Sequence, residues 1–115
     1  VGVDLELLLP HFEPAWNILH AHEKALLESL DSKTREKSAQ HHAFLKIWTG
    51  KEACLKLEGQ GLLVEPGLLE VIGHTARNHA NAASYQLDYF ETDRFIACLS
   101  ERNALEDDQR LVRNL

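Results

Sequence analysis

Residues 33–57 place the strongest constraint on how this chain folds. They contain no proline and a single glycine, Gly50, so the segment is predicted to form one long helix. Its first half is polar, whereas its second half is apolar on nearly every side, which indicates that the C-terminal half is buried. Gly59 and Gly61 follow at once and supply a helix stop and a tight turn.

The first six residues alternate between apolar and other side chains, with Val1, Val3 and Leu5 at the odd positions. This period of two is typical of a half-buried strand. It places the side chains of Asp4 and Glu6 next to each other on one face of that strand.

The remaining segments predict an α+β fold, a small antiparallel sheet packed on one long helix, in a single domain over residues 1–115. Shorter helices are expected after Pro14, at residues 15–19 and 23–30. Further strands, the last two forming a hairpin across Glu91-Thr92-Asp93, are expected at residues 68–72, 84–90 and 94–99. Residues 77–83 are expected to be a loop. The charged tail, about residues 101–115, is expected to be helical at residues 105–111.

Composition argues against several classes of function. Twelve basic against eighteen acidic side chains give a net charge of −6, whereas a nucleic-acid-binding protein needs a basic face. No apolar run approaches the roughly 18 residues of a membrane span, and the opening residues do not resemble a signal peptide, so the cytoplasm is the expected setting. Cys54 and Cys98 are expected to be reduced core thiols. The chain opens on Val1 and contains no methionine, so we expect a fragment, a processed chain or one half of a longer protein.

Three carboxylates carry the chemistry that the sequence suggests. Asp4 and Glu6 share a strand face, and Glu52 lies on a helix that can pack across it. Carboxylate oxygens without sulfur or imidazole suit a hard cation, magnesium above all. Trp48, Glu52 and Lys56 follow one another at four-residue spacing, so they line one stripe of the helix. Lys56 would then reach a phosphate held by the same metal, and Trp48 would keep water out of the site.

Simpler interpretations stay open. The two acids of the strand can face solvent, a Lys-Glu pair in a helix is commonly a weak surface ion pair, and Trp48 can be a core residue. The histidine pairs His20-x-His22 and His41-His42 do not match zinc spacing, so a histidine metal site is not favoured. The chain has neither the nucleophile elbow of a serine hydrolase nor a glycine-rich phosphate loop after a strand.

The segments Val1-Gly2-Val3-Asp4-Leu5-Glu6 and Trp48-Thr49-Gly50-Lys51-Glu52-Ala53, continuing to Lys56, resemble the two signature segments of the 4′-phosphopantetheinyl transferases. The Trp-Thr-x-Lys-Glu sequence, with Leu57-Glu58-Gly59-Gln60-Gly61-Leu62 after it, is closer to the surfactin-synthetase type, and the chain resembles the C-terminal half of that type. The resemblance covers roughly residues 1–100, including the closing strand Phe95-Ile96-Ala97-Cys98-Leu99.

This resemblance implies an enzyme that moves 4′-phosphopantetheine from coenzyme A to a serine of an acyl or peptidyl carrier protein, in fatty acid, polyketide or nonribosomal peptide biosynthesis. Asp4, Glu6 and Glu52 would hold magnesium on the pyrophosphate. Glu52 would also be the general base for the serine hydroxyl, and Lys56 would contact a coenzyme A phosphate. Leu7–Leu9 would either help to dock the carrier protein or be buried in the core.

The resemblance also implies a missing partner. In the surfactin type the site forms between two similar halves of one chain, and the segment of the first half that grips coenzyme A has no match here. A second half-domain, or assembly of the chain into a homo-oligomer, is therefore expected. Two alternatives remain: a catalytically silent half-domain that binds a carrier protein or partner, and an unrelated α+β domain whose acids face water.

Overall fold

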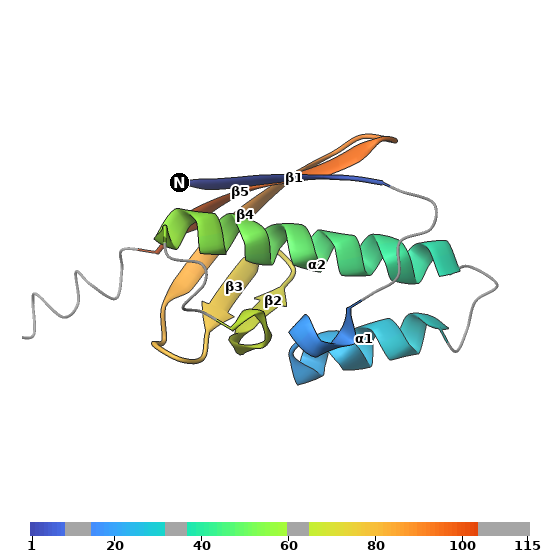
Figure 1. Ribbon diagram of the computed structural model, residues 1–115, viewed down its shortest axis with the longest axis horizontal. Helices are drawn as coiled ribbons and strands as arrows, with labels where there is room; N and C mark the ends of the chain where they lie inside the picture. Colours follow the sequence, from blue (N-terminus) through green and yellow to red (C-terminus); the bar gives the residue numbers. More distant parts are fainter. Residues whose placement is uncertain (9–14, 32–36, 60–64, 104–115) are drawn as a thin grey trace, which may run out of the picture.

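A computed structural model of the chain describes residues 1–8, 15–31, 37–59 and 65–103. It has the predicted α+β class. The long helix α2 (Lys37–Glu58) lies against one face of an antiparallel sheet, and α1 (Ala21–Asp31) packs beside it (Figure 1). Single turns of 3₁₀ helix, η1 (Trp16–Ile18) and η3 (Pro66–Leu68), lie beside the sheet edge near the start of α1. Within the described ranges, no helix combines the length and the apolar character that crossing a bilayer requires.

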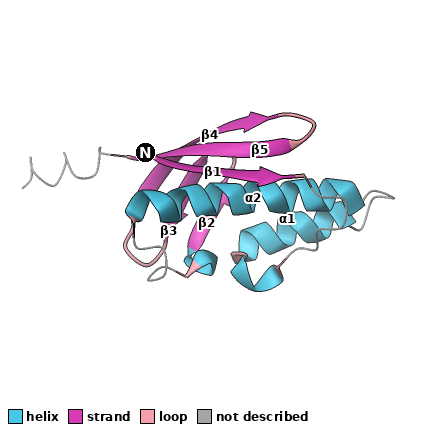
Figure 2. Ribbon diagram, turned by 45° about the horizontal axis from the view of Figure 1, so that its top comes forward, coloured by secondary structure: helices cyan, strands magenta, loops and turns pink. Residues whose placement is uncertain are grey.

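The sheet joins the beginning of the chain to its end. Its strands are β1 (Gly2–Leu7), β2 (Leu69–Ile72), β3 (Thr75–Asn78), β4 (Ser84–Glu91) and β5 (Phe95–Arg102). They follow the order β1-β5-β4-β3-β2, and every neighbouring pair is antiparallel (Figure 2). Strand β1 is thus one edge of the sheet, with Gly2 opposite Ser100 and Leu7 opposite Phe95, and β2 is the other edge.

Most predicted elements are confirmed. The long helix is present from residue 37, whereas residues 33–36 lie outside the described part, as do Pro14, Gly61 and the tail at residues 105–111. Gly59 takes a left-handed conformation, with φ of 71°, directly after α2, as a helix-ending glycine should. The closing hairpin is also confirmed, and β5 continues to Arg102 into the segment expected to be tail.

Two predicted elements need correction. Residues 77–83 were expected to form a loop, and residues 79–83 do so, but Arg77 and Asn78 belong to β3. This strand lacks a strong apolar pattern and is held instead by pairing with β2 on one side and β4 on the other. The helix expected at residues 15–19 is only the turn η1.

The core lies between α2 and the sheet. It is formed by buried side chains from both layers, with Trp48 packed against it: Leu19, Leu27, Phe44, Ile47, Ala53, Cys54, Leu55, Leu69, Val71, Ala76, Ala83, Tyr85, Leu87 and Cys98. Both cysteines are free and buried, as expected. Burial raises the pKa of the Cys54 thiol to about 12 and that of Cys98 to about 11, so neither is a ready nucleophile.

Strand β1 has the predicted period of two, but its apolar side chains face the opposite way from expectation. Gly2 and Asp4 are buried against α2, whereas Val3 and Leu5 are 53% and 52% exposed. Gly2 explains this orientation, because a Cβ atom there would lie only 1.9 Å from the carbonyl oxygen of Ala53. Only glycine therefore allows the strand to approach the helix so closely.

As a result, the sheet face that points away from α2 is apolar where β1, β5 and β4 meet. Leu5 lies opposite Ala97, which in turn lies opposite Phe90, and these three form a row across the strands. Leu7 and Phe90 are 58% and 59% exposed. We call this surface the outer sheet face. It consists of Val3, Leu5, Leu7, Phe90, Phe95, Ala97 and Leu99.

Candidate functional site

The structure brings together the four residues that the sequence singled out. Asp4 and Glu6 lie on the face of β1 that packs against the C-terminal half of α2, where Glu52 and Lys56 lie one turn apart. Lys56 Nζ donates a hydrogen bond of 2.6 Å to Asp4 Oδ1. Glu6 interacts electrostatically with Asp4, Glu52 and Lys56. We call these four residues the acid cluster.

Three acids facing one lysine leave the acid cluster with excess negative charge. Burial, a hydrogen bond with Asp4 and the charges of Asp4 and Glu52 together raise the pKa of Glu6 to about 7, despite the opposing effect of Lys56. Burial, followed by the charge of Asp4, also raises the pKa of Glu52. A divalent cation would remove this repulsion, because its charge favours ionised carboxylates.

The donor atoms of the acid cluster fit a hard cation. Asp4 is 4% exposed, and when Glu6 is ionised the buried Oδ2 atom of Asp4 has no hydrogen-bond donor among the described residues. A buried carboxylate oxygen without a partner is costly, and a metal ion would satisfy it. The three carboxylates are more widely spaced than a closed metal site, since they are not among the donor groups found within 4.8 Å of one another in the described ranges. Magnesium usually keeps several water ligands and shares substrate phosphates, so a spaced set of carboxylates suits it.

The pKa of Glu6 makes a prediction about stability. Its value of about 7 in the folded domain lies above its ordinary 4.5, so between these pH values the folded state holds a proton that the unfolded state has released. The free energy of unfolding of the metal-free protein should therefore fall as the pH rises from about 4.5 to about 7. The slope of this fall depends on how many more protons the folded state binds than the unfolded state, and Glu6 contributes at most one. Urea unfolding at a series of pH values measures this. Glu6→Gln should remove that component of the slope, and an unchanged slope would contradict the assignment.

Lys51 lies beside Glu52 in the sequence but belongs to a different part of the structure. Its side chain is fully buried, and its Nζ atom pairs at 2.7 Å with Glu23 Oε1. It also donates hydrogen bonds of 2.7 Å to the carbonyl oxygens of Ile18 and Pro66. This motif lysine is therefore not part of a surface ion pair. No local pattern around Glu23 announces the pairing, because the two residues come from different helices.

Comparisons with known proteins identify the family of the chain. The sequence model of the 4′-phosphopantetheinyl transferase superfamily matches residues 1–111. The chain belongs to this superfamily. A Synechocystis protein provisionally named a 4′-phosphopantetheinyl transferase is 36% identical to it over 89 residues, which are 75% of this chain and 31% of that protein. The chain thus spans about a third of the length of the curated relative it matches. No solved structure matches it.

Within this member of the 4′-phosphopantetheinyl transferase superfamily, sequence reasoning missed a second group of polar side chains. His20, Glu70 and His79 gather at the β2 edge of the sheet, with donor atoms within 4.8 Å of one another. Judging histidine pairs by their local spacing did not reveal them, because His20 and His79 come from segments far apart in the sequence.

Proposed function

We propose that this protein transfers the 4′-phosphopantetheine group of coenzyme A to a serine hydroxyl of an acyl or peptidyl carrier protein. The observation that carries the proposal is the acid cluster, in which side chains from β1 and from the distant helix α2 meet. Membership of the superfamily supports it. The cytoplasmic setting expected from the sequence is part of the same proposal.

Each residue of the acid cluster has a role in this proposal. Asp4, Glu6 and Glu52 would hold magnesium, which when bound neutralises the pyrophosphate and favours attack on phosphorus. Glu52 accepts the proton of the serine hydroxyl, and its raised pKa makes it a stronger base than a solvated glutamate. The serine oxygen bonds to phosphorus as the bond to 3′,5′-ADP breaks. Lys56, whose side chain is 54% exposed, can turn toward a coenzyme A phosphate and offset its charge.

The outer sheet face supports the expected need for a second half-domain or subunit. Single exposed apolar residues are ordinary, but a row across three neighbouring strands is typical of an interaction surface. The row begins on β1, the strand that also carries Asp4 and Glu6. The acid cluster lies on the opposite side of this edge strand, so a partner packed on the outer sheet face would reach the cluster by extending around the β1 edge. It would also supply cations for coenzyme A, which the domain needs because its own net charge is −6.

For Leu7–Leu9 the sequence left two roles open, docking of the carrier protein and burial in the core. Leu7 is exposed and Leu8 is half-buried, whereas Leu9 lies outside the described residues. Core burial is therefore wrong for Leu7. Docking of the carrier protein beside β1 remains a proposal.

Titration calorimetry with coenzyme A, using the complete native polypeptide, separates an enzyme from a silent docking module. For the enzyme, we expect magnesium to strengthen coenzyme A binding at least about tenfold, equivalent to about 1.4 kcal/mol. An apo-carrier protein should then gain the mass of phosphopantetheine. A chain that binds the carrier, but whose affinity for coenzyme A does not respond to magnesium and which transfers nothing, would be the silent module instead.

A further inference from the structure

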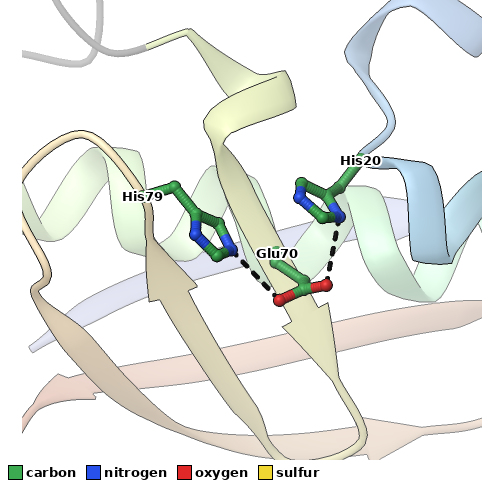
Figure 3. Close-up of side chains that lie close together, drawn as sticks. All are labelled: His20, Glu70 and His79. Carbon is green, nitrogen blue, oxygen red and sulfur yellow. Dashed lines mark hydrogen bonds and ion pairs between the residues drawn. The ribbon is translucent and has the colours of Figure 1, made fainter.

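A second polar cluster lies at the opposite edge of the sheet from the acid cluster. His20 comes from the segment just before α1, Glu70 from β2 and His79 from the turn just after β3, and their side chains converge (Figure 3). His20 Nδ1 lies 3.0 Å from one carboxylate oxygen of Glu70, and His79 Nε2 lies 3.1 Å from the other. Because β1 and β2 are the two outermost strands of the sheet, the two clusters are separate sites.

The backbone around this cluster is held in place by buried contacts. Glu23, 2% exposed, accepts hydrogen bonds of 2.7 Å from the backbone N–H of His20 and from that of Val71, which follows Glu70. The backbone N–H of His79 donates to the carbonyl oxygen of Leu68 at 2.9 Å. The three side chains are therefore brought together by the fold itself, and preorganisation of this kind favours a tight site.

The cluster is built around a nearly buried carboxylate, a group that attracts a cation. The Glu70 side chain is only 7% exposed, and the side chains that contact its carboxylate in the described part of the chain are His20, His22 and His79. Hydrogen bonding, from His22 first and then His79, lowers the pKa of Glu70, so it is a carboxylate near neutral pH. When His20 Nδ1 carries no proton, that nitrogen and a carboxylate oxygen of Glu70 are two hydrogen-bond acceptors only 3.0 Å apart. Two such atoms repel unless a proton or a metal ion lies between them.

We propose that His20, Glu70 and His79 bind a zinc ion. Two imidazole nitrogens and one carboxylate oxygen are a common zinc ligand set, and tetrahedral bonds of about 2.1 Å place such donors about 3.4 Å apart. His20 Nδ1 and His79 Nε2 lie 3.0 and 3.1 Å from different oxygens of Glu70, and one ligand atom from each of the three residues lies within 4.8 Å of the others, so an ion between them would be within reach of both carboxylate oxygens. The imidazoles of His20 and His79 are stacked at 4.9 Å and must tilt toward each other on binding. Their side chains are 26% and 40% exposed, so they are free to do so and accessible to the ion.

The two clusters differ in the metal they suit. The acid cluster offers only oxygen, which favours magnesium, whereas imidazole favours zinc. Zinc at the second cluster would cross-link the start of α1 to β2 and to the turn after β3. A fourth position remains for water or for His22, whose Nδ1 atom is in contact with Glu70.

Metal titration of the complete native polypeptide tests the site. After removal of metal with a chelator, zinc is added at pH 7.5 in competition with a chromophoric indicator. We expect a zinc site that persists in Asp4→Asn but is weakened at least about 100-fold by His20→Ala or by His79→Ala. His42→Ala, which removes an exposed imidazole outside the cluster, should bind as the unaltered protein does.

X-ray absorption of the zinc-bound protein gives a second measurement that does not depend on variants. It should show imidazole nitrogen and carboxylate oxygen around zinc, without sulfur. Zinc binding that is equal in the His20→Ala/His79→Ala double variant and the unaltered protein would overturn the proposal, as would failure to bind zinc at about 100 μM. Either result would leave magnesium-dependent transfer untouched, because that is measured through Asp4 and Glu52.

Discussion

Glu52→Gln should lower phosphopantetheine transfer by about 10³-fold or more while the domain stays folded. In the proposed mechanism, this change removes a magnesium ligand and the general base together, and loss of a general base alone commonly costs about 10²–10⁴-fold. Folding should survive, because the amide has the shape of the carboxylate and Glu52 is only half-buried. The change also removes one of the negative charges that raise the pKa of Glu6. Transfer is measured as the mass gained by an apo-carrier protein, and folding by thermal unfolding.

A matched control separates this effect from a general change of charge. Glu28→Gln makes the same substitution at an exposed position of α1, away from the acid cluster, and should retain transfer. Asp4→Ala, at the buried acid that pairs with Lys56, should also abolish transfer. Near-normal turnover in Glu52→Gln or in Asp4→Ala would show that the metal site has been assigned to the wrong residues.

The acid cluster could be predicted from the sequence because each half of it has a local pattern. The alternation in residues 1–6 puts Asp4 and Glu6 on one strand face, and four-residue spacing puts Glu52 and Lys56 on one helix face. That the two faces meet was an inference from their joint presence and from the family resemblance. The packing of Gly2 against Ala53 now gives a physical reason for that meeting.

Which face of β1 packs against the core could not be predicted in the same way. An alternating strand is normally assigned with its apolar side chains toward its own core. In this domain the side of β1 that carries Gly2 and Asp4 faces the core, and the side chain of Leu5 lies on the outer sheet face. Strand alternation gives the two faces but not which of them a helix covers.

Contacts between distant segments also had no local sign in the sequence. Glu23 and Lys51, like His20 and His79, are each unremarkable in their own segments and acquire partners only when α1, α2 and the β2 edge pack together. Strand β3 is a further example. Its own residues have little preference for a strand, and pairing with β2 and β4 fixes its extended conformation.

The buried pair of Lys51 and Glu23 leads to the prediction with the largest effect on stability. Lys51→Met should lower the free energy of unfolding by about 3–5 kcal/mol, because it leaves a buried carboxylate without its cation. The carbonyl oxygens of Ile18 and Pro66 lose a donor as well. Burial lowers the pKa of Lys51, and the hydrogen bond and charge of Glu23 oppose that shift, so the pair depends on both members. Urea unfolding measures the loss, and Lys24→Met, at an exposed position of α1, should cost less than about 0.5 kcal/mol.

A double variant shows whether the charge pair itself is responsible. In Glu23→Gln/Lys51→Met no unpaired charge remains, so the double change should cost clearly less than the sum of the two single changes. Simple additivity would contradict a coupled buried pair and would attribute the loss to packing of the lysine stem. Glu23 also accepts the hydrogen bond from the backbone N–H of His20. Glu23→Gln, which weakens that contact, should therefore reduce zinc affinity at the second cluster, whereas Lys24→Met should not.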